Sequence, residues 1–300
     1  MFNIPPSLPP TQYVSYPDSQ TSAEALEEIC AQNNISFETW NAAPDSFQKD
    51  IRFIAHRGAN SNAPENTIPA YQEAALQGYK FVEADISWTK DGVPVLLHDK
   101  TINRTASFSN GFPLILPRYC SDMTYDELLQ YDFGIKHGEQ YEGTKIPTFE
   151  DFLKCCRDYD LSPYIELKDD RTVNNDKIKM LVDMVDNYGL TDKVTWISFN
   201  ADYLKMLSEI SPKARLGLLC DTTPSDKTLK ILNSLKTSDN EVFLDAKVSK
   251  LTKNSVKLMK NNGFEVEVWT VDDLKYFQIA KDFGCSGITT DNLTNDSIDD

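Results

Sequence analysis

The chain has 300 residues, of which 46 are acidic and 30 basic, so its formal net charge is −16. A chain of this length can bury the core of one large α/β domain or of two small ones. The acidic balance argues against nucleic acids and anionic membrane surfaces as partners, because both require positive patches on the protein. An anionic substrate must therefore be attracted by a local positive site rather than by the overall field of the protein.

The sequence shows neither a targeting segment nor a membrane span. The N-terminus lacks the basic region and the apolar stretch of a secretory signal, and no apolar run is long enough to cross a bilayer. The six cysteines form no C-x-x-C pair and have no zinc-ligand spacing. Cys156 on the apolar side of a predicted helix and Cys220 at the end of an apolar strand are typical of buried free thiols. These features predict a cytoplasmic protein.

Residues 1–50 differ in composition from the rest and are predicted to form an N-terminal extension. Prolines are frequent at its start, which favours an extended arm. A short helix is predicted over 22–32, and Phe37 and Trp40 could pack it onto the main domain. Two interpretations remain open. The extension is either passive, or it attaches the protein to a homo-oligomer or to a larger particle such as a phage tail, with which it would be released.

From Ile51 onward, strand-like and helical patterns alternate along the chain. Helices are expected between most of the strands, one of them starting at Thr148 and others ending at Gly189 and Gly284. The strands are expected at 51–57, 81–87, 162–168, 193–199, 214–220, 241–247, 264–270 and 286–290. Eight strands that alternate with helices predict an α/β fold, a (β/α)8 TIM barrel over 51–300.

One further strand-like run, Val93–His98, does not fit the barrel count. It follows Ile86 across Asp91-Gly92, a pair that is typical of turns between antiparallel strands. We therefore expect a hairpin at the barrel mouth, which would bring His98 beside Glu83.

Polar and charged side chains lie at or near the ends of the predicted barrel strands. Glu83 and Asp85 are two positions apart on a strand, so both carboxylates leave the same face, as a Mg²⁺ or Ca²⁺ site requires. The C-terminal ends of barrel strands meet at one mouth, so all these residues are expected to converge there. They are His56, Arg57, Glu83, Asp85, Glu166, Lys168, Trp269 and Asp291.

A series of short motifs follows the same order along the chain. They are His56-Arg57-Gly58, Pro64-Glu65-Asn66-Thr67, Glu83-x-Asp85, Thr89-Lys90-Asp91-Gly92-x-Pro94-Val95, His98-Asp99, Arg104-Thr105, Ile146-Pro147-Thr148, Glu166-Leu167-Lys168, Val268-Trp269-Thr270-Val271 and Thr289-Thr290-Asp291. In this order the chain resembles the glycerophosphodiester phosphodiesterase family of phospholipase C-like barrels. The resemblance extends roughly from Ile51 to Leu293.

The resemblance implies the catalytic groups and the metal ligands. His56 and His98 would be the acid–base pair, since two imidazoles can divide the proton transfers of phosphodiester hydrolysis. Glu83, Asp85 and Glu166 would hold one divalent cation, Ca²⁺ or Mg²⁺, through oxygen atoms.

The resemblance also implies how the substrate is bound. Arg57 and Lys168 would bind its phosphate. Glu65 would be a further metal ligand or would orient a histidine, with a cap of the following helix as the alternative. Trp269 would wall the pocket or, alternatively, belong to the core.

A small insertion after the second strand is implied by the same resemblance. Residues 101–146 fit it, because they look irregular apart from one short helix near 125–131. His137 lies in this insertion and is expected to be an exposed loop residue without a role.

The predicted function is therefore metal-dependent hydrolysis of glycerophosphodiesters to an alcohol and glycerol phosphate. Water could attack directly, or a glycerol hydroxyl could first form a cyclic phosphate. One alternative is a hydrolase of polymeric glycerophosphate such as teichoic acid, tethered to a larger assembly by the N-terminal arm. Another is a non-catalytic module that binds a glycerophosphoryl group, but such a module would have no need of both histidines.

Overall fold

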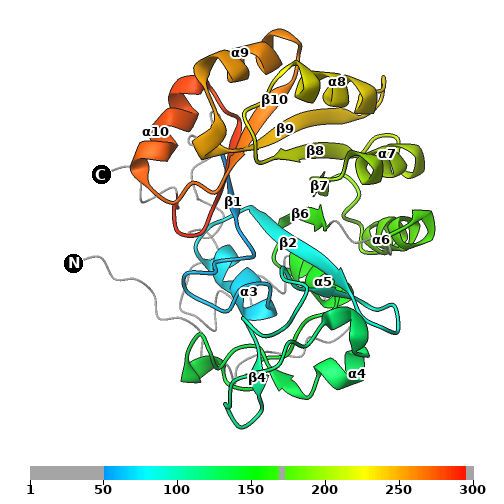
Figure 1. The fold of residues 1–300 in the computed structure, drawn as a ribbon, viewed down its shortest axis with the longest axis vertical. Coiled ribbons are helices and arrows are strands. Elements are labelled where there is room, and N and C mark those ends of the chain that lie inside the picture. The colour runs from blue at the N-terminus through cyan, green and yellow to red at the C-terminus, as the bar shows by residue number, and fades with distance from the viewer. Residues whose placement is uncertain (1–50, 169–172, 295–300) are drawn as a thin grey trace.

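The computed structural model describes residues 51–168 and 173–294. Eight parallel strands in these residues form a closed barrel, because β1 pairs with both β2 and β11 (Figure 1). The barrel strands are β1 (Arg52–Ala55), β2 (Phe81–Trp88), β6 (Ser162–Leu167), β7 (Thr195–Ser198), β8 (Arg215–Cys220), β9 (Glu241–Lys247), β10 (Glu265–Trp269) and β11 (Gly287–Thr290). The predicted (β/α)8 fold is confirmed, with every strand within three residues of its expected position.

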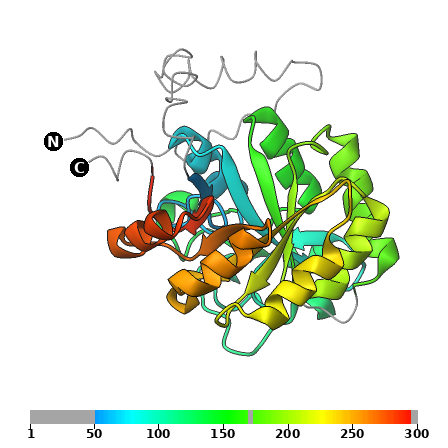
Figure 2. The same cartoon turned by 90° about the horizontal axis from the view of Figure 1, so that it is seen from above.

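Helices surround the barrel on its outer face (Figures 1 and 2). They are α3 (Ile68–Leu76), α5 (Phe149–Asp158), α6 (Asn175–Asn187), α7 (Ala201–Ile210), α8 (Asp226–Leu235), α9 (Lys253–Asn261) and α10 (Leu274–Phe283). Thr148 caps α5 in a reciprocal capping box with Asp151, and Gly284 ends α10 in the left-handed conformation. The predicted helix limits at these residues are confirmed.

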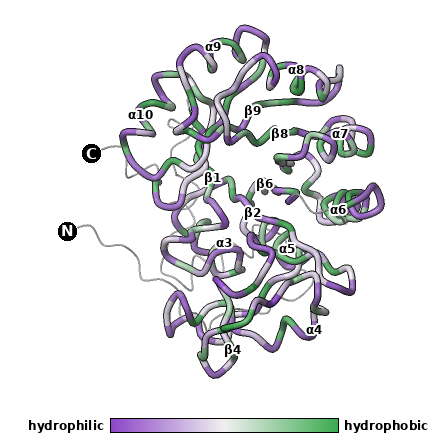
Figure 3. Tube along the Cα trace, viewed as in Figure 1, coloured by the Kyte–Doolittle hydropathy of each residue, from purple (hydrophilic) through white to green (hydrophobic). Residues whose placement is uncertain are grey.

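Apolar side chains fill two layers, one between strands and helices and one inside the barrel. Along the chain trace, hydrophobic residues are frequent in barrel strands such as β8 and β9 (Figure 3). The inner layer is small and includes Phe243 of β9. A Cβ atom at Gly217 on β8 would lie 2.4 Å from the Phe243 ring, so only glycine at this position leaves room for that ring. The barrel interior is therefore packed, and a site can form only at one of its ends.

The predicted hairpin is confirmed: β3 (Pro94–Leu96) runs antiparallel to β2. The segment that follows β3 is less irregular than the sequence suggested. It contains a two-stranded ribbon of β4 (Ser107–Phe108) and β5 (Tyr131–Asp132), and its helix α4 (Tyr125–Leu128) ends earlier than expected. Two 3₁₀ turns, Cys120–Asp122 and Glu139–Tyr141, complete it. A separate small apolar core holds this insertion together.

Several other expectations can be compared with the described residues. Cys156 is a buried free thiol, but Cys220 is only half-buried, because it is the last residue of β8 where the strand leaves the barrel. His137 is exposed, as expected. Within 51–168 and 173–294, no helix has the length and apolar character needed to span a membrane. The predicted helix over 22–32 and Trp40 lie outside the described residues.

Candidate active site

His56 lies at the end of β1 in a backbone that turns sharply. Arg57 and Gly58 have φ angles of +57° and +81°, and a Cβ at Gly58 would lie 2.7 Å from atoms of Ala70 in α3. Glycine thus lets this loop pack directly against the helix. The His56 backbone N–H donates to the Thr290 carbonyl oxygen at 3.0 Å, which ties the turn to the end of β11.

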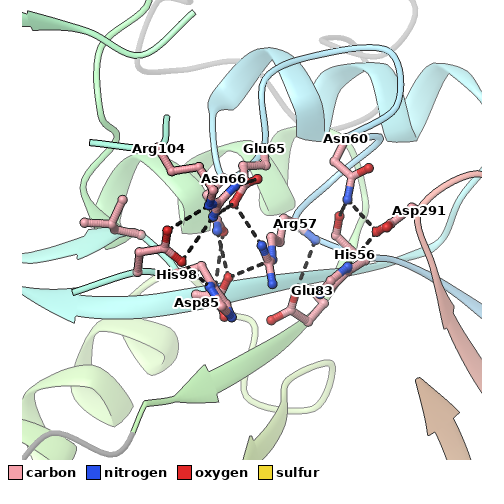
Figure 4. Close-up of polar contacts among 12 residues, drawn as sticks. His56, Arg57, Asn60, Glu65, Asn66, Glu83, Asp85, His98, Arg104 and Asp291 are labelled. Carbon is pink, nitrogen blue, oxygen red and sulfur yellow. Dashed lines mark hydrogen bonds and ion pairs between the residues drawn. The ribbon is translucent and has the colours of Figure 1, made fainter. Parts of the chain in front are cut away.

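The His56 ring is held by Asp291, just after β11. His56 Nδ1 lies 2.6 Å from Asp291 Oδ1, and Asn60 Nδ2 donates to the same oxygen at 2.6 Å (Figure 4). Burial works against ionisation of Asp291, but the hydrogen bond and charge of His56 outweigh it, so the pKa of Asp291 lies below its usual value. With Nδ1 engaged by a carboxylate, Nε2 is the ring nitrogen left for chemistry.

Three carboxylates from two neighbouring strands meet at the mouth of the barrel. Asp85 of β2 stands opposite Glu166 of β6 in the strand register, and Glu83 points to the same side. One oxygen of each lies within 4.8 Å of the others, and all three residues are buried. The predicted ligand residues are therefore brought together by β2 and β6.

The three carboxylates have different proton affinities. Burial and the charge of Asp85 raise the pKa of Glu83 above its usual value and that of Glu166 to about 7. Burial also opposes ionisation of Asp85, but the charges of Lys168 and Arg57 outweigh it and lower the Asp85 pKa. The three carboxylates would thus carry more negative charge than Arg57 and Lys168 offset, which keeps the pKa of two of them high.

Arg57 and Lys168 are the two cations of this cluster. Lys168 Nζ lies 2.9 Å from Glu166 Oε1 and 3.3 Å from Asp85 Oδ1. Arg57 Nε lies 3.2 Å from Asp85 Oδ2, although not in hydrogen-bonding alignment, and the Arg57 backbone N–H donates to Glu83 Oε2. Both cations therefore border the carboxylates and offset part of their negative charge.

His98 follows β3 and lies next to Asp85. The Leu97 N–H donates to the Asp85 carbonyl oxygen at 3.0 Å, so the hairpin places His98 beside Asp85 rather than beside the expected Glu83. His98 Nδ1 lies 2.7 Å from Asp99 Oδ1. Burial lowers the pKa of His98, although the charge of Asp85 opposes this shift. Like His56, this imidazole is oriented by a carboxylate at Nδ1.

Glu65 binds two arginines, as Figure 4 shows. Its carboxylate accepts hydrogen bonds from Arg57 Nη1 at 3.0 Å and from Arg104 Nη2 at 2.8 Å. Arg104 also donates to Asp99. The alternative of Glu65 as a helix cap is wrong, because Thr67 occupies the N-cap of α3. Nor does Glu65 belong to the carboxylate cluster, so its contacts are those of a residue that positions Arg57.

Comparison with known proteins agrees with this geometry. Residues 56–295 match the model of the glycerophosphoryl diester phosphodiesterase family. The chain belongs to this family. A glycerophosphodiester phosphodiesterase from Caldanaerobacter subterraneus is 30% identical over 239 residues, which are 80% of this chain and 93% of the relative.

Solved structures of relatives have the same fold. A phosphodiesterase from Oleispira antarctica, in complex with the product sn-glycerol-3-phosphate, superposes with a TM-score of 0.72 at 25% identity. The match covers 82% of this chain and 95% of that one. A glycerophosphodiester phosphodiesterase from Parabacteroides distasonis gives a TM-score of 0.64 at 30% identity, over 81% and 93% of the two chains. The protein is thus an enzyme, a phosphoric diester hydrolase.

Two aromatic side chains, one after β7 and one at the end of β10, meet near the mouth of the barrel of this phosphodiesterase. Trp269, at the end of β10, is half-buried, and its Nε1–H donates to the Asp245 carbonyl oxygen at 3.1 Å. Phe199, just after β7, meets the Trp269 ring edge-to-face at 5.6 Å and is itself exposed. Trp269 is therefore neither fully buried in the core nor fully exposed.

Some contacts of the phosphodiesterase site were not predicted. Asn66 Nδ2 donates to Asp85 Oδ2 at 2.8 Å, and Asp99 and Arg104 link His98 to Glu65. Asn66, Asp99 and Arg104 all belong to the motifs that carry the family resemblance. Their membership in these motifs was the signal that could have identified them. Asn60 and Phe199 carried no such signal, because their positions depend on loops that only the folded chain defines.

Proposed function

We propose that the enzyme hydrolyses glycerophosphodiesters to an alcohol and glycerol phosphate with the help of one divalent cation, Ca²⁺ or Mg²⁺. The observation that carries the proposal is the buried group of Glu83, Asp85 and Glu166, flanked by Arg57 and Lys168. The bound sn-glycerol-3-phosphate of the Oleispira relative supports it, because that compound is the product of such a reaction.

The residues present fit a hard cation. Glu83 Oε1 is buried and has no hydrogen-bond partner, so one ligand atom is not engaged by the protein. All three donors are carboxylate oxygens, which Ca²⁺ and Mg²⁺ prefer and which differ from the nitrogen and sulfur ligands typical of zinc. When bound, the cation would supply positive charge next to the phosphoryl oxygens.

His56 and His98 divide the proton transfers in this proposal. The nitrogen Nδ1 of each ring faces a carboxylate, Asp291 or Asp99, so Nε2 exchanges the proton with the substrate. One imidazole takes a proton from the attacking oxygen as its bond to phosphorus forms. The other gives a proton to the alcohol oxygen as its bond to phosphorus breaks. Attack by water and attack by a glycerol hydroxyl, followed by hydrolysis of the cyclic phosphate, need the same pair.

Arg57 and Lys168 bind the phosphate. The Arg57 guanidinium is held by Glu65 and Asp85 at the edge of the carboxylate group, and Lys168 reaches the same group from β6. Burial disfavours the charge of Lys168, but Asp85 and Glu166 outweigh it and raise its pKa, so this amine stays cationic. Both side chains can therefore offset the charge of a phosphodiester within an acidic protein.

Turnover of glycerophosphocholine tests the proposal. Release of glycerol phosphate with Ca²⁺ or Mg²⁺, and its loss with EDTA, would support a metal-dependent enzyme. Substrate binding without any turnover would favour the glycerophosphoryl-binding module. Release of glycerol phosphate from teichoic acid, but not from glycerophosphocholine, would favour the polymer hydrolase instead.

A further inference from the structure

The insertion after β3 exposes an unusual number of large apolar side chains. We call residues 108–119 the apolar loop. Phe112 is 66%, Ile115 90% and Leu116 74% exposed, and Phe108 and Tyr119 are exposed as well. Elsewhere in the described residues only three large apolar side chains are comparably exposed. They are Met180 on α6, Phe199 just before α7 and Leu274 on α10. Soluble proteins rarely present clustered apolar side chains to water without a binding partner.

Hydrogen bonds of the loop backbone hold these side chains in exposed positions. Asn103 Nδ2 donates to the carbonyl oxygens of Leu114 at 3.0 Å and Leu116 at 2.8 Å, and Asn103 Oδ1 accepts from the Arg118 N–H at 2.8 Å. The Leu114 side chain is buried in the insertion core. The loop backbone is therefore satisfied and anchored on its inner side, while Ile115 and Leu116 remain exposed.

The segment that contains the apolar loop is locally cationic in sequence, unlike the chain as a whole. Between Lys100 and Ser121 the sequence has three cations, Lys100, Arg104 and Arg118, and no acidic residue, in a chain of net charge −16. The Arg118 guanidinium lies 5.7 Å from the ring centroid of Phe108 and the same distance from that of Tyr131. Aliphatic and aromatic side chains beside an arginine are typical of segments that enter the headgroup region of lipids.

The apolar loop lies on the same side of the barrel as the active site. Arg104, the neighbour of Asn103, pairs with Asp99, and Asp99 contacts His98. In Figure 2 the insertion lies on the side toward which the barrel strands point. A surface that binds the loop would therefore face the mouth of the barrel.

We propose that the apolar loop docks the enzyme onto a zwitterionic lipid surface, from which the site takes glycerophosphodiesters that carry an acyl chain, namely lysophospholipids. This inference rests on the proposed function. The net charge of −16 disfavours both an anionic bilayer and a second copy of the chain. Arg104 is paired with Glu65 and Asp99, which leaves Lys100 and Arg118 to contact the phosphates of zwitterionic headgroups.

Vesicles of phosphatidylcholine that contain lysophosphatidylcholine provide the test, with soluble glycerophosphocholine as the second substrate. The test variant is the double change Ile115→Asp with Leu116→Asp. The matched control is Leu274→Asp, which makes the same apolar-to-acid change at a 58% exposed position on α10. Binding is measured by co-sedimentation, and kcat/KM is measured on both substrates.

We expect the double variant to bind vesicles at least about ten-fold more weakly than the wild type. The two apolar side chains that would move from water into the lipid are replaced by charged ones, so this favourable transfer is lost. Its kcat/KM on lysophosphatidylcholine in vesicles should fall with the binding, while its kcat/KM on glycerophosphocholine stays unchanged. Leu274→Asp should match the wild type on both substrates. Retained activity on glycerophosphocholine also shows that the double variant is folded.

Three outcomes would overturn the inference. The wild type could fail to bind the vesicles, the double variant could bind as well as Leu274→Asp, or the wild type could be a dimer that the double variant dissociates in light scattering. The last result would assign the loop to a contact between copies. A wild type that binds vesicles but hydrolyses neither substrate would instead contradict the proposed function.

Discussion

His56 Nδ1 lies 2.6 Å from Asp291 Oδ1, although 235 positions separate the two residues in the chain. The contact exists because β1 and β11 are neighbours in the closed barrel, paired from Arg52 with Gly287 to Ala55 with Thr290. Barrel closure thus orients a proposed catalytic imidazole, and the fold and the chemistry depend on the same strand pairing.

The first prediction concerns this contact. Asp291→Asn keeps the size of the side chain but removes the charge beside Nδ1, so the imidazole loses its preferred tautomer and orientation. We expect kcat on glycerophosphocholine to fall about ten-fold or more, with KM little changed. Steady-state kinetics over a range of pH values check this. The matched control is Asp202→Asn in the exposed first turn of α7, which should keep wild-type rates. An Asp291→Asn enzyme with a wild-type rate and pH profile would refute the role of Asp291.

The two histidines should be needed for turnover but not for folding. His56→Ala and His98→Ala should each lower kcat on glycerophosphocholine by about 10²- to 10⁴-fold, the usual contribution of general acid or base catalysis. His137→Ala, in the exposed loop, is the control and should leave kcat unchanged. Circular dichroism and calcium titration should show that all three variants fold and bind the cation. If His56→Ala or His98→Ala kept more than about a tenth of the wild-type rate, that assignment would be wrong.

Metal-free protein should lose stability as the pH rises through the range in which Glu166 ionises. The Glu166 pKa is about 7 in the folded protein against an ordinary value of 4.5, so the folded state holds the proton more tightly. The stabilisation from this proton is complete below the unfolded pKa and is lost as the pH approaches the folded pKa. A bound cation takes the place of this proton. Added Ca²⁺ or Mg²⁺ should therefore raise the melting temperature more above the folded-state Glu166 pKa of about 7 than below it.

Thermal unfolding at about pH 6 and about pH 8, in EDTA and in excess Ca²⁺, measures this difference. Glu166→Gln serves as the comparison, because it cannot ionise and should show a smaller pH dependence in EDTA. An equal Ca²⁺ effect at both pH values, or a larger one at the lower pH, would contradict the assignment of Glu166 as a ligand.

The barrel and most of its site could be predicted from the sequence for a physical reason. Strands that are buried on both faces read as apolar runs, and their C-terminal ends meet at one mouth, so the positions of Glu83 and Glu166 on their strands were enough to place them together. The turn pair Asp91-Gly92 likewise identified the hairpin. The order of the matched motifs then supplied roles that strand patterns alone do not carry.

Other features could not be predicted because they depend on the tertiary path of loops. The strands β4 and β5 have two residues each, too few to show a strand period. The pairing of Glu65 with Arg104 requires the insertion to fold back over the start of α3, which no local pattern encodes. Arg57 has a positive φ angle that its residue type does not favour, so its backbone conformation could not be inferred, although its place at the barrel mouth was expected.

The N-terminal extension should be dispensable for catalysis. None of the proposed site residues belongs to 1–50, so a variant lacking residues 1–48 should keep kcat on glycerophosphocholine within a few-fold of the full chain. If the extension attaches the protein to other copies, light scattering should show a lower mass for the truncated protein. Loss of folding or of activity would mean that the extension contributes to the barrel.

The most direct test of the account is glycerophosphocholine hydrolysis measured together with cation binding. We expect one Ca²⁺ or Mg²⁺ per chain, activity that EDTA removes, and weaker cation binding in Glu83→Gln, Asp85→Asn and Glu166→Gln. Excess cation should partly restore the activity of these variants, because each keeps two of three carboxylate ligands. Full activity in EDTA, or unchanged cation affinity in all three variants, would contradict it.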